Sequence, residues 1–519
     1  MNDLLTMNVL LENLQNPALY PHSVAQFEVL ETHISWVLLT GDYAYKIKKP
    51  VNFGFLDFST LGKRHHYCDE ELRLNRRLAP ELYLEVVVIT GDEEEPQING
   101  NGPILEYAVK MRQFPQSNVL NNLLKSEQLS VEHLDELANV IANFHANVEI
   151  ADESMNFGSP EKIIKPILEN FIQIRQSLIH PLNEGLRLLE EWSKLEHQRL
   201  VAVFEYRKKQ GFIRECHGDL HLANIVLFDN KIIPFDGIEF NNNLRWIDVM
   251  SELAFLVMDL KAHQRQDFGF RVLNSYLEQT GDYWGLQIFR FYCVYRAMVR
   301  AKINILNCQQ HKDEQSFSKA YQEYNNYLQL ASEYTQTTSR KLVICHGFSG
   351  SGKTVVSQLL LQHLPGIRIR SDVERKRLFG MEPETRSHSS PKSGLYSPEI
   401  NQQTYLRLLE LAKSILTSGF SVIVDATFLK HQQRRLFQNL ALELDVPLSI
   451  VSCQAKDSVL RQRVINRERV GKDASEAGVA VLELQMREIQ PLLPEEKKAA
   501  VIVNTAKEIQ IDKVIKKLQ

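Results

Sequence analysis

Residues 216–227 read CHGDLHLANIVL, and residues 234–240 then read PFDGIEF. The first stretch crowds His, Gly, Asp and Asn together, and the second places one more Asp-Gly pair at the end of an apolar run. Asp229-Asn230 lies between two short apolar segments, so the pattern predicts a β-hairpin that turns there. Such a hairpin would bring both groups of polar side chains to one end of a small sheet.

Three of these side chains suit the transfer of a phosphoryl group. That reaction requires a carboxylate to orient an acceptor hydroxyl and oxygen ligands to hold Mg²⁺ against the phosphates. Asp219 suits the first role, and Asn224 and Asp236 suit the second. Asp219 and Asn224 are five residues apart, as in the catalytic loop of protein kinases, and Asp236 follows twelve residues later. A metal-hydrolase role for His217 and His221 is disfavoured, because a single His-x-x-x-His pair is usually structural.

The two stretches resemble the signature of the aminoglycoside phosphotransferase and choline kinase-like family, a branch of the kinase-like fold. The catalytic loop of that family begins with His-Gly-Asp, which here is His217, Gly218 and Asp219. The order Phe-Asp-Gly around Asp236 departs from the Asp-Phe-Gly of protein kinases. The resemblance implies a bilobal domain with a β-rich small lobe before a helical lobe.

The segment that precedes these stretches agrees with a small lobe. Residues 33–49 alternate apolar and polar side chains on both sides of a Gly-containing turn, which predicts a hairpin. The resemblance places a phosphate-binding lysine at Lys46. Glu71 is its expected partner from the helix that follows, although Lys48 and Glu70 are close alternatives. No Gly-x-Gly-x-x-Gly loop precedes Lys46, so another segment must cover the phosphates.

A second stretch, GFSGSGKT at residues 347–354, satisfies G-x-x-x-x-G-K-[ST] between a strand pattern and a helix pattern. Its glycines let backbone N–H groups face phosphate oxygens, while Lys353 reaches the outer phosphates and Thr354 can bind Mg²⁺. Asp425 ends another apolar strand and suits the second carboxylate near Mg²⁺, although it could instead cap the next helix. The nucleotide-binding residues predicted in this loop are Gly347, Ser349, Gly350, Ser351, Gly352, Lys353 and Thr354.

Apolar strands and helical patterns alternate from residue 340 onward, which predicts a parallel α/β domain. With its loop, this part resembles the small P-loop kinases of the gluconate kinase, chloramphenicol phosphotransferase, zeta-toxin and polynucleotide 5′-kinase group. The resemblance implies an arginine-bearing lid, for which Arg463 and Arg467 lie one helical turn apart. It also implies an acidic residue that activates the acceptor. Asp372 is the candidate base, with a turn or cap role equally open, and Arg375 is the acceptor-side cation.

The whole chain has the composition of a globular protein. Its 519 residues exceed the size of one ordinary core, with 44% hydrophobic and 24% charged residues. We find neither a leader-like opening nor a run of about 18 apolar residues without a charge, which disfavours secretion and membrane spanning. The six cysteines form no Cys-x-x-Cys pair, so we expect a reducing, cytoplasmic environment.

We therefore predict two domains, of α/β and α+β class, joined in a polar stretch near residue 335. They are a kinase-like domain at 1–335, with a small lobe at about 25–115 and a helical lobe at about 116–335, and a P-loop kinase domain at 340–519. From Lys341 onward 27 Lys and Arg outnumber 19 Asp and Glu, a net +8, and the rest of the chain carries −12. This contrast fits two domains that meet different ligands.

Both resemblances together imply a bifunctional phosphotransferase that uses ATP or GTP with Mg²⁺ at two separate sites and acts on small-molecule hydroxyls. Two alternatives stay open: a P-loop domain that only regulates the first domain, and a kinase-like domain that modifies a protein. Nucleic acid is disfavoured as a partner, because no basic stripe interleaved with aromatic residues is evident. The Pro- and Ser-rich segment 381–400 is either a loop near the acceptor site or an idle insertion.

Overall fold

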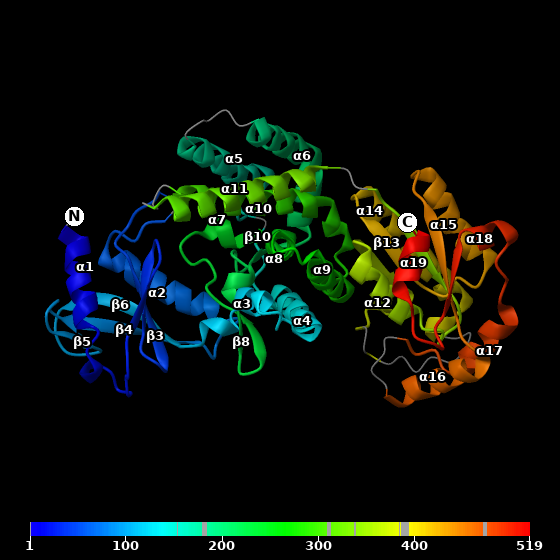
Figure 1. The fold of residues 1–519 in the computed structure, drawn as a ribbon, viewed down its shortest axis with the longest axis horizontal. Helices are drawn as coiled ribbons and strands as arrows, with labels where there is room; N and C mark the ends of the chain where they lie inside the picture. Colours follow the sequence, from blue (N-terminus) through cyan, green and yellow to red (C-terminus); the bar gives the residue numbers. More distant parts are fainter. Residues whose placement is uncertain are drawn as a thin grey trace. The chain divides into compact units, whose positions relative to one another are not determined.

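The computed structural model forms two compact units (Figure 1). The residues it describes are 2–54, 56–152, 154–178, 184–308, 313–336, 339–382, 385, 394–470 and 475–518. The amino-terminal unit comprises Met1–Glu169 and Val201–Asp259, and the carboxy-terminal unit comprises Asn170–Leu200 and Leu260–Gln519. The helices that follow residue 260 therefore belong to the same compact unit as the segment GFSGSGKT at residues 347–354. The domain boundary near residue 335 stays a prediction.

A six-stranded antiparallel sheet begins the amino-terminal unit, with strand order β1-β2-β3-β6-β4-β5. Its strands are β1 Glu28–Glu31, β2 Ser35–Leu39, β3 Tyr43–Lys48, β4 Tyr83–Gly91, β5 Pro96–Ile98 and β6 Ile104–Arg112. The predicted hairpin is β2–β3, in which Leu39 pairs with Ala44 across a turn at Gly41, whose φ is 96°. A side chain is strained at such a φ, which accounts for the glycine.

Helices cover both faces of this sheet because its side chains alternate. Helix α2 (Leu61–Asn75) contributes Cys68 to a core with Val109 of β6, and its Leu72 packs against that core. On the other face, α1 (Asn2–Asn13) buries Leu10 against residues that include Ile47. The sequence had not singled out α1.

The predicted catalytic hairpin consists of β8 (Ile225–Phe228) and β9 (Lys231–Pro234). Asp229 and Asn230 have φ values of 46° and 61°, as the two-residue turn requires. Val226 and Ile233 pack in the same core as α2 and β6, which fixes the hairpin beneath the small sheet. A second strand pair joins β7 (Ile213–Glu215) to β10 (Trp246–Asp248). The helices along this stretch of chain are η3 Leu222–Asn224, α3 Leu120–Lys125, α4 Val131–Asn147, α5 Pro160–Ser177, α6 Glu184–Lys209, α7 Asn242–Arg245 and α8 Val249–Ala262. Residues 170–200, which include the second part of α5 and most of α6, belong to the carboxy-terminal unit.

The carboxy-terminal unit contains a five-stranded parallel sheet of order β12-β13-β11-β14-β15, here called the phosphate-loop sheet. Its strands are β11 Leu342–His346, β12 Gly366–Arg370, β13 Ser421–Asp425, β14 Leu448–Gln454 and β15 Ala500–Asn504. Its helices are α12 Lys353–His363, α13 Ser371–Arg377, α14 Pro398–Thr417, α15 His431–Glu443, α16 Asp457–Val470, α17 Val479–Glu488, α18 Pro494–Lys498 and α19 Ile511–Leu518. Helices α12 and α19 pack on one face of the sheet and α14 contacts β12 and β13. The predicted fold class is confirmed.

Three further helices belong to this unit: α9 Gln266–Thr280, α10 Leu286–Cys308 and α11 Glu314–Thr335. Helix α9 contacts the edge strand β12, where Asn274 donates to the carbonyl of Gly366 (2.9 Å) and accepts from Arg368 N–H (2.7 Å). Glu278 pairs with Arg368 (2.9 Å) and Arg370 (2.7 Å). These side chains satisfy an edge that would otherwise expose unpaired backbone groups.

Among the described helices, none combines the length and the apolar character needed to cross a membrane.

Candidate active sites

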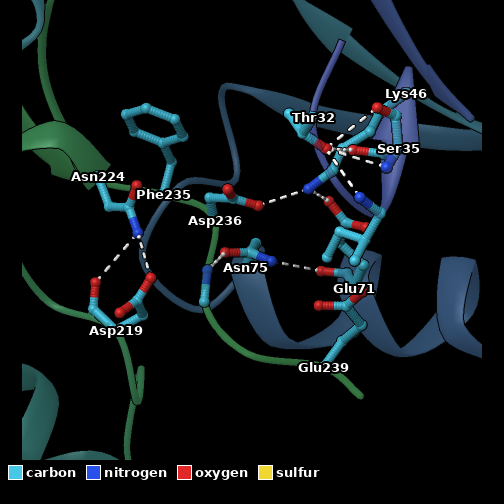
Figure 2. Close-up of polar contacts among 12 residues, drawn as sticks. Thr32, Ser35, Lys46, Glu71, Asn75, Asp219, Asn224, Phe235, Asp236 and Glu239 are labelled. Atoms are coloured by element: carbon cyan, nitrogen blue, oxygen red, sulfur yellow. Dashed lines mark hydrogen bonds and ion pairs between the residues drawn. The ribbon is translucent and has the colours of Figure 1, made fainter. Parts of the chain in front are cut away.

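The first site lies in the amino-terminal unit and is organised around Lys46 of β3. Its ammonium group donates to Glu71 Oε1 of α2 (2.8 Å) and to Asp236 Oδ1 in the loop after β9 (2.5 Å), as Figure 2 shows. Burial alone would lower the pKa of Lys46, but the carboxylates of Asp236 and Glu71 raise it well above its usual value. Lys46 therefore stays charged. It links Glu71 of α2 to Asp236, which follows Lys46 by 190 residues in the sequence.

The structure shows the contacts of each alternative that the sequence left open around Lys46. Glu71 is fully buried, and its second oxygen accepts from Lys48 (2.6 Å), so both lysines contact it. Lys48 also pairs with Glu239, three residues after Asp236. Burial raises the pKa of Glu71, but the charges of Lys46 and Lys48 lower it further than burial raises it. Glu70 instead faces arginines, including Arg73 at 2.9 Å.

Asp219 and Asn224 form the other half of the first site. Asn224 Nδ2 donates to Asp219 Oδ2 (3.0 Å) and to the Asp219 carbonyl (3.1 Å). The carbonyl of Asn224 accepts from Phe235 N–H (2.9 Å), which places Asn224 beside the residue that precedes Asp236. The side chains of Asp219 and Asp236 are 35% and 44% exposed, so a ligand can reach both. The predicted Asp219, Asn224 and Asp236 thus come together (Figure 2).

Oxygen donors at this place fit a hard cation. Asp236 supplies carboxylate oxygens. Asn224 directs its Nδ2 group to Asp219, so its amide oxygen is the atom that suits a cation. Carboxylate and amide oxygens are the ligands that Mg²⁺ prefers. Asp236 also has a left-handed φ of 62°, a conformation rare for a residue with a side chain and more frequent at functional sites.

Glu252 of α8 is a site residue that sequence reasoning missed. Its carboxylate accepts from His217 N–H (3.2 Å) and Gly218 N–H (2.6 Å), immediately before Asp219, and from His145 (3.0 Å). Burial raises the pKa of Glu252, but the hydrogen bond and charge of His145 bring it down to about 2. The carboxylate stays ionised and fixes the loop that presents Asp219. Its signal in the sequence was an acidic residue in the mostly apolar first two turns of α8.

The turn between β1 and β2 takes the chain position where a glycine-rich loop is missing. Thr32 Oγ1 accepts from Ser35 N–H (2.9 Å) and Ile34 N–H (3.3 Å), and it donates to the Ser35 carbonyl (3.0 Å). The turn is therefore held by a hydroxyl group and contains no glycine. Figure 2 shows Thr32 and Ser35 in the same close-up as Lys46.

The second site is a cavity of about 470 Å³ in the carboxy-terminal unit. The predicted residues that line it are Ser349, Gly350, Gly352, Lys353, Thr354, Asp372, Arg375, Asp425, Arg463 and Arg467. Gly347 and Ser351 belong to the same loop but are not among its lining residues. Gly347 has a φ of 144°, and a Cβ there would lie 2.5 Å from the Cys453 carbonyl oxygen, so only glycine fits.

The phosphate loop, residues 347–354, leads directly into α12, whose first residue is Lys353. The N-terminus of a helix attracts anions through its unpaired N–H groups and its dipole. Lys353 Nζ donates to the carbonyl of Phe348 (2.8 Å) within the loop. Asp425, at the end of β13, is 5% exposed and accepts from Ser357 Oγ of α12 (3.3 Å). Asp425 therefore faces the helix that carries Lys353 and Thr354.

Asp372 and Arg375 form another part of the cavity wall. Arg375 Nη1 donates to Asp372 Oδ1 (3.0 Å), and its Nη2 lies 3.4 Å from Asn401 Oδ1. Burial raises the pKa of Asp372, but the charges of Arg375, Arg370 and Arg467 outweigh burial and lower it. The carboxylate is therefore ionised, as a proton acceptor must be.

The two predicted lid arginines line the cavity but have different partners. Arg463 donates to the Gly350 carbonyl (3.3 Å) and to Thr505, including its carbonyl at 2.6 Å. Arg467 donates to the Ala477 carbonyl (2.6 Å). Within the predicted loop 381–400, residues 383, 384 and 386–393 lie outside the described residues.

Comparisons with known proteins match the carboxy-terminal part of the chain and, separately, most of its length. Residues 342–492 match the family model described as an AAA domain. An "Uncharacterized protein" of Mycobacterium tuberculosis is 29% identical over 456 residues, which cover 88% of this chain and 89% of that protein, and a protein of Mycobacterium bovis matches equally. The P-loop domain that the sequence predicted is therefore confirmed.

Solved structures align with each part separately. A choline/ethanolamine kinase family protein of Mesorhizobium loti covers 63% of this chain and 99% of its own, with 10% identity and a TM-score of 0.39. The Mycobacterium tuberculosis APS kinase covers 35% of this chain and 98% of its own, with 18% identity and a TM-score of 0.25. Both of these proteins are described as kinases.

Proposed function

We propose that this chain is an ATP- and Mg²⁺-dependent phosphotransferase with two separate nucleotide sites, each acting on a hydroxyl group of a small molecule. Residues 1–335 form the kinase-like domain in this proposal, and residues 340–519 form the P-loop kinase domain. The observation that carries it is the first site, where Lys46 contacts Glu71 and Asp236 beside the Asp219–Asn224 pair.

At the first site, Asp219 accepts the proton of the acceptor hydroxyl, whose oxygen then forms a bond to the γ-phosphorus of ATP. The bond between that phosphorus and the bridging oxygen breaks, and ADP leaves with the electron pair. Mg²⁺ held by Asn224 and Asp236 would neutralise the charge of the phosphates. Lys46 exchanges its contact with Asp236 for a phosphate oxygen, while Glu71 keeps it in place.

At the second site, the N-terminus of α12 and Lys353 bind the phosphates, and Thr354 and Asp425 would hold Mg²⁺. Asp372 accepts the proton of the acceptor hydroxyl, and Arg375 orients that carboxylate at 3.0 Å. Asp372 and Lys353 line one cavity, so a nucleotide and an acceptor can share it. This shared cavity favours a catalytic P-loop domain over a purely regulatory one.

The proposal is tested by incubating wild type, Asp219→Ala and Lys353→Ala with Mg²⁺-ATP and a metabolite extract, and by following phosphate transfer with mass spectrometry. We expect each variant to lose a different phosphorylated product. If Asp219→Ala abolishes every product while Lys353→Ala changes only a rate, the P-loop domain is a regulator. Phosphate found on proteins and on no metabolite would contradict the small-molecule acceptor.

A further inference from the structure

Helix α17 places a glutamine directly on the phosphate loop. Gln485 Oε1 accepts from Ser349 N–H at 2.9 Å, and Gln485 Nε2 donates to Ser349 Oγ at 3.0 Å. Both residues line the cavity of the second site. Two hydrogen bonds in opposite directions fix the carboxamide against one residue of the loop.

The hydrogen bond to Ser349 N–H involves a backbone donor of the phosphate loop. Backbone N–H groups of a glycine-rich loop are donors for phosphate oxygens. Here a neutral amide oxygen accepts from one of them. Lys353 likewise donates to the carbonyl of Phe348. Two of the groups that would bind phosphate are therefore satisfied by partners within the protein.

The position of Gln485 is set by the packing of α17. Leu482, fully buried, belongs to a core cluster with Leu460 and Val464 of α16, and Met486 packs against that cluster. These apolar contacts fix the side of α17 that faces α16. Gln485 follows Leu482 by three residues, so it lies near the same face of the helix. The carboxamide is thus held at the loop by a helix that has its own core.

We propose that Gln485 is a positioning residue that competes with the nucleotide for the phosphate loop: its carboxamide holds Ser349 until a phosphate oxygen takes over the same N–H group. This rests on the nucleotide role proposed for the second site. Binding of a nucleotide then requires Gln485 to release Ser349, so the residue sets how tightly the loop binds phosphate.

The test uses the full-length chain and two substitutions at this position. Gln485→Ala removes the competing oxygen, and Gln485→Glu puts a negative charge in nearly the same volume. Gln462→Ala is the matched control, because Gln462 lies on the adjoining helix α16 with an exposed carboxamide that contacts Asn466. The probes are Mg²⁺-ADP and Mg²⁺-ATP. The readout is the nucleotide concentration that half-protects amides 347–363 from hydrogen exchange, which reports on the second site alone.

We expect Gln485→Ala to bind both nucleotides about fivefold more tightly than wild type, the equivalent of one net hydrogen bond of about 1 kcal/mol. We expect Gln485→Glu to bind at least about tenfold more weakly than Gln485→Ala, because a carboxylate repels phosphate and accepts more strongly from the N–H group. Gln462→Ala should match wild type. A merely structural role of Gln485 would lower affinity in the alanine variant.

Two outcomes would overturn the inference, and a third would remove its basis. Unchanged or weaker binding by Gln485→Ala means that the glutamine does not compete with phosphate. Equal binding by Gln485→Ala and Gln485→Glu means that the side chain lies away from the phosphates. If wild type shows no protection and behaves as Lys353→Ala does, the proposed nucleotide site itself fails. Protection in wild type together with equal affinities fails the inference alone.

Discussion

The two lysines that we propose to bind phosphate lie in opposite electrostatic settings. In the first site, Lys46 is paired with two carboxylates, Glu71 and Asp236. In the second site, Lys353 donates to a neutral carbonyl oxygen of its own loop. Under the proposed function, phosphate displaces a charged partner from Lys46 but only a peptide carbonyl from Lys353.

This difference follows from how each fold builds a site for phosphate. The first site assembles side chains from β3, α2 and the loop after β9, so buried charges must neutralise one another until ligands arrive. The second site uses backbone N–H groups and a helix N-terminus, which supply partial charges without burying a full one. A side-chain site therefore depends on many distant residues, whereas a backbone site depends on one short loop.

The largest effects on the rate of phosphate transfer are expected at the two proposed proton acceptors, one in each site. Asp219→Asn and Asp372→Asn keep the shape of the side chain and remove the proton acceptor, so each should slow transfer to its own product about 10²- to 10⁴-fold. The rate of formation of each phosphorylated product is the measurement. Asp229→Asn is the control, because this turn residue with a φ of 46° tolerates asparagine. Equal rates in Asp219→Asn and Asp229→Asn would remove Asp219 from the mechanism.

The buried charges of the first site predict the next largest effect. Lys48→Met leaves Glu239 without its lysine and Glu71 with one lysine in place of two, so we expect a loss of about 3–5 kcal/mol in the free energy of unfolding. Denaturant titration measures it. Lys110→Met, which removes a pair with the exposed Glu85, should cost about 0–1 kcal/mol. Equal costs would show that the buried network has no special role in stability.

The two units should also lose stability in different pH ranges. Burial, together with the charges of Arg434 and Lys353, lowers the pKa of His346 from 6.5 to about 4. The folded state then resists protonation, so stability of the phosphate-loop sheet falls as the pH drops from 6.5 to 4, by about 3 kcal/mol. The carboxyl of Glu252 has a pKa lowered from 4.5 to about 2, so its contribution is lost only between these values.

Hydrogen exchange of amides in β11 and in α8, followed from pH 7 to pH 4, measures which of the two loses stability first as the pH falls. His346→Gln removes the titrating group and should flatten the pH dependence for β11 while leaving α8 unchanged. An unchanged slope in His346→Gln would assign the acid sensitivity to another group.

Local spacing explains what could be predicted from the sequence. Asp219 and Asn224 lie within one short loop, and Lys353 and Thr354 lie within another, so the pattern alone indicates their chemistry. The structure brings Asp219 and Asn224 to 3.0 Å as that pattern suggests. The fold class was also predictable, because strand and helix patterns alternate in one order.

Contacts between distant residues explain what the sequence did not show. Glu252 reaches the loop that holds Asp219 from 34 residues away, and Gln485 reaches Ser349 from 136 residues away. Neither contact leaves a periodic or spaced signal. The sequence also could not decide between Lys46 and Lys48 as the partner of Glu71. Both lysines point to Glu71 from one face of β3. Only the packing of α2 against the sheet decides such contacts.

Under the proposed function, one chain carries two independent nucleotide sites. Equilibrium titration of the full-length chain with Mg²⁺-ATP, with bound nucleotide counted per chain, tests it most directly. We predict two bound nucleotides for wild type, one for Lys353→Ala and one for Asp236→Ala, with none in the double variant. A single nucleotide bound to wild type, or the loss of both from Lys353→Ala alone, would contradict two independent sites.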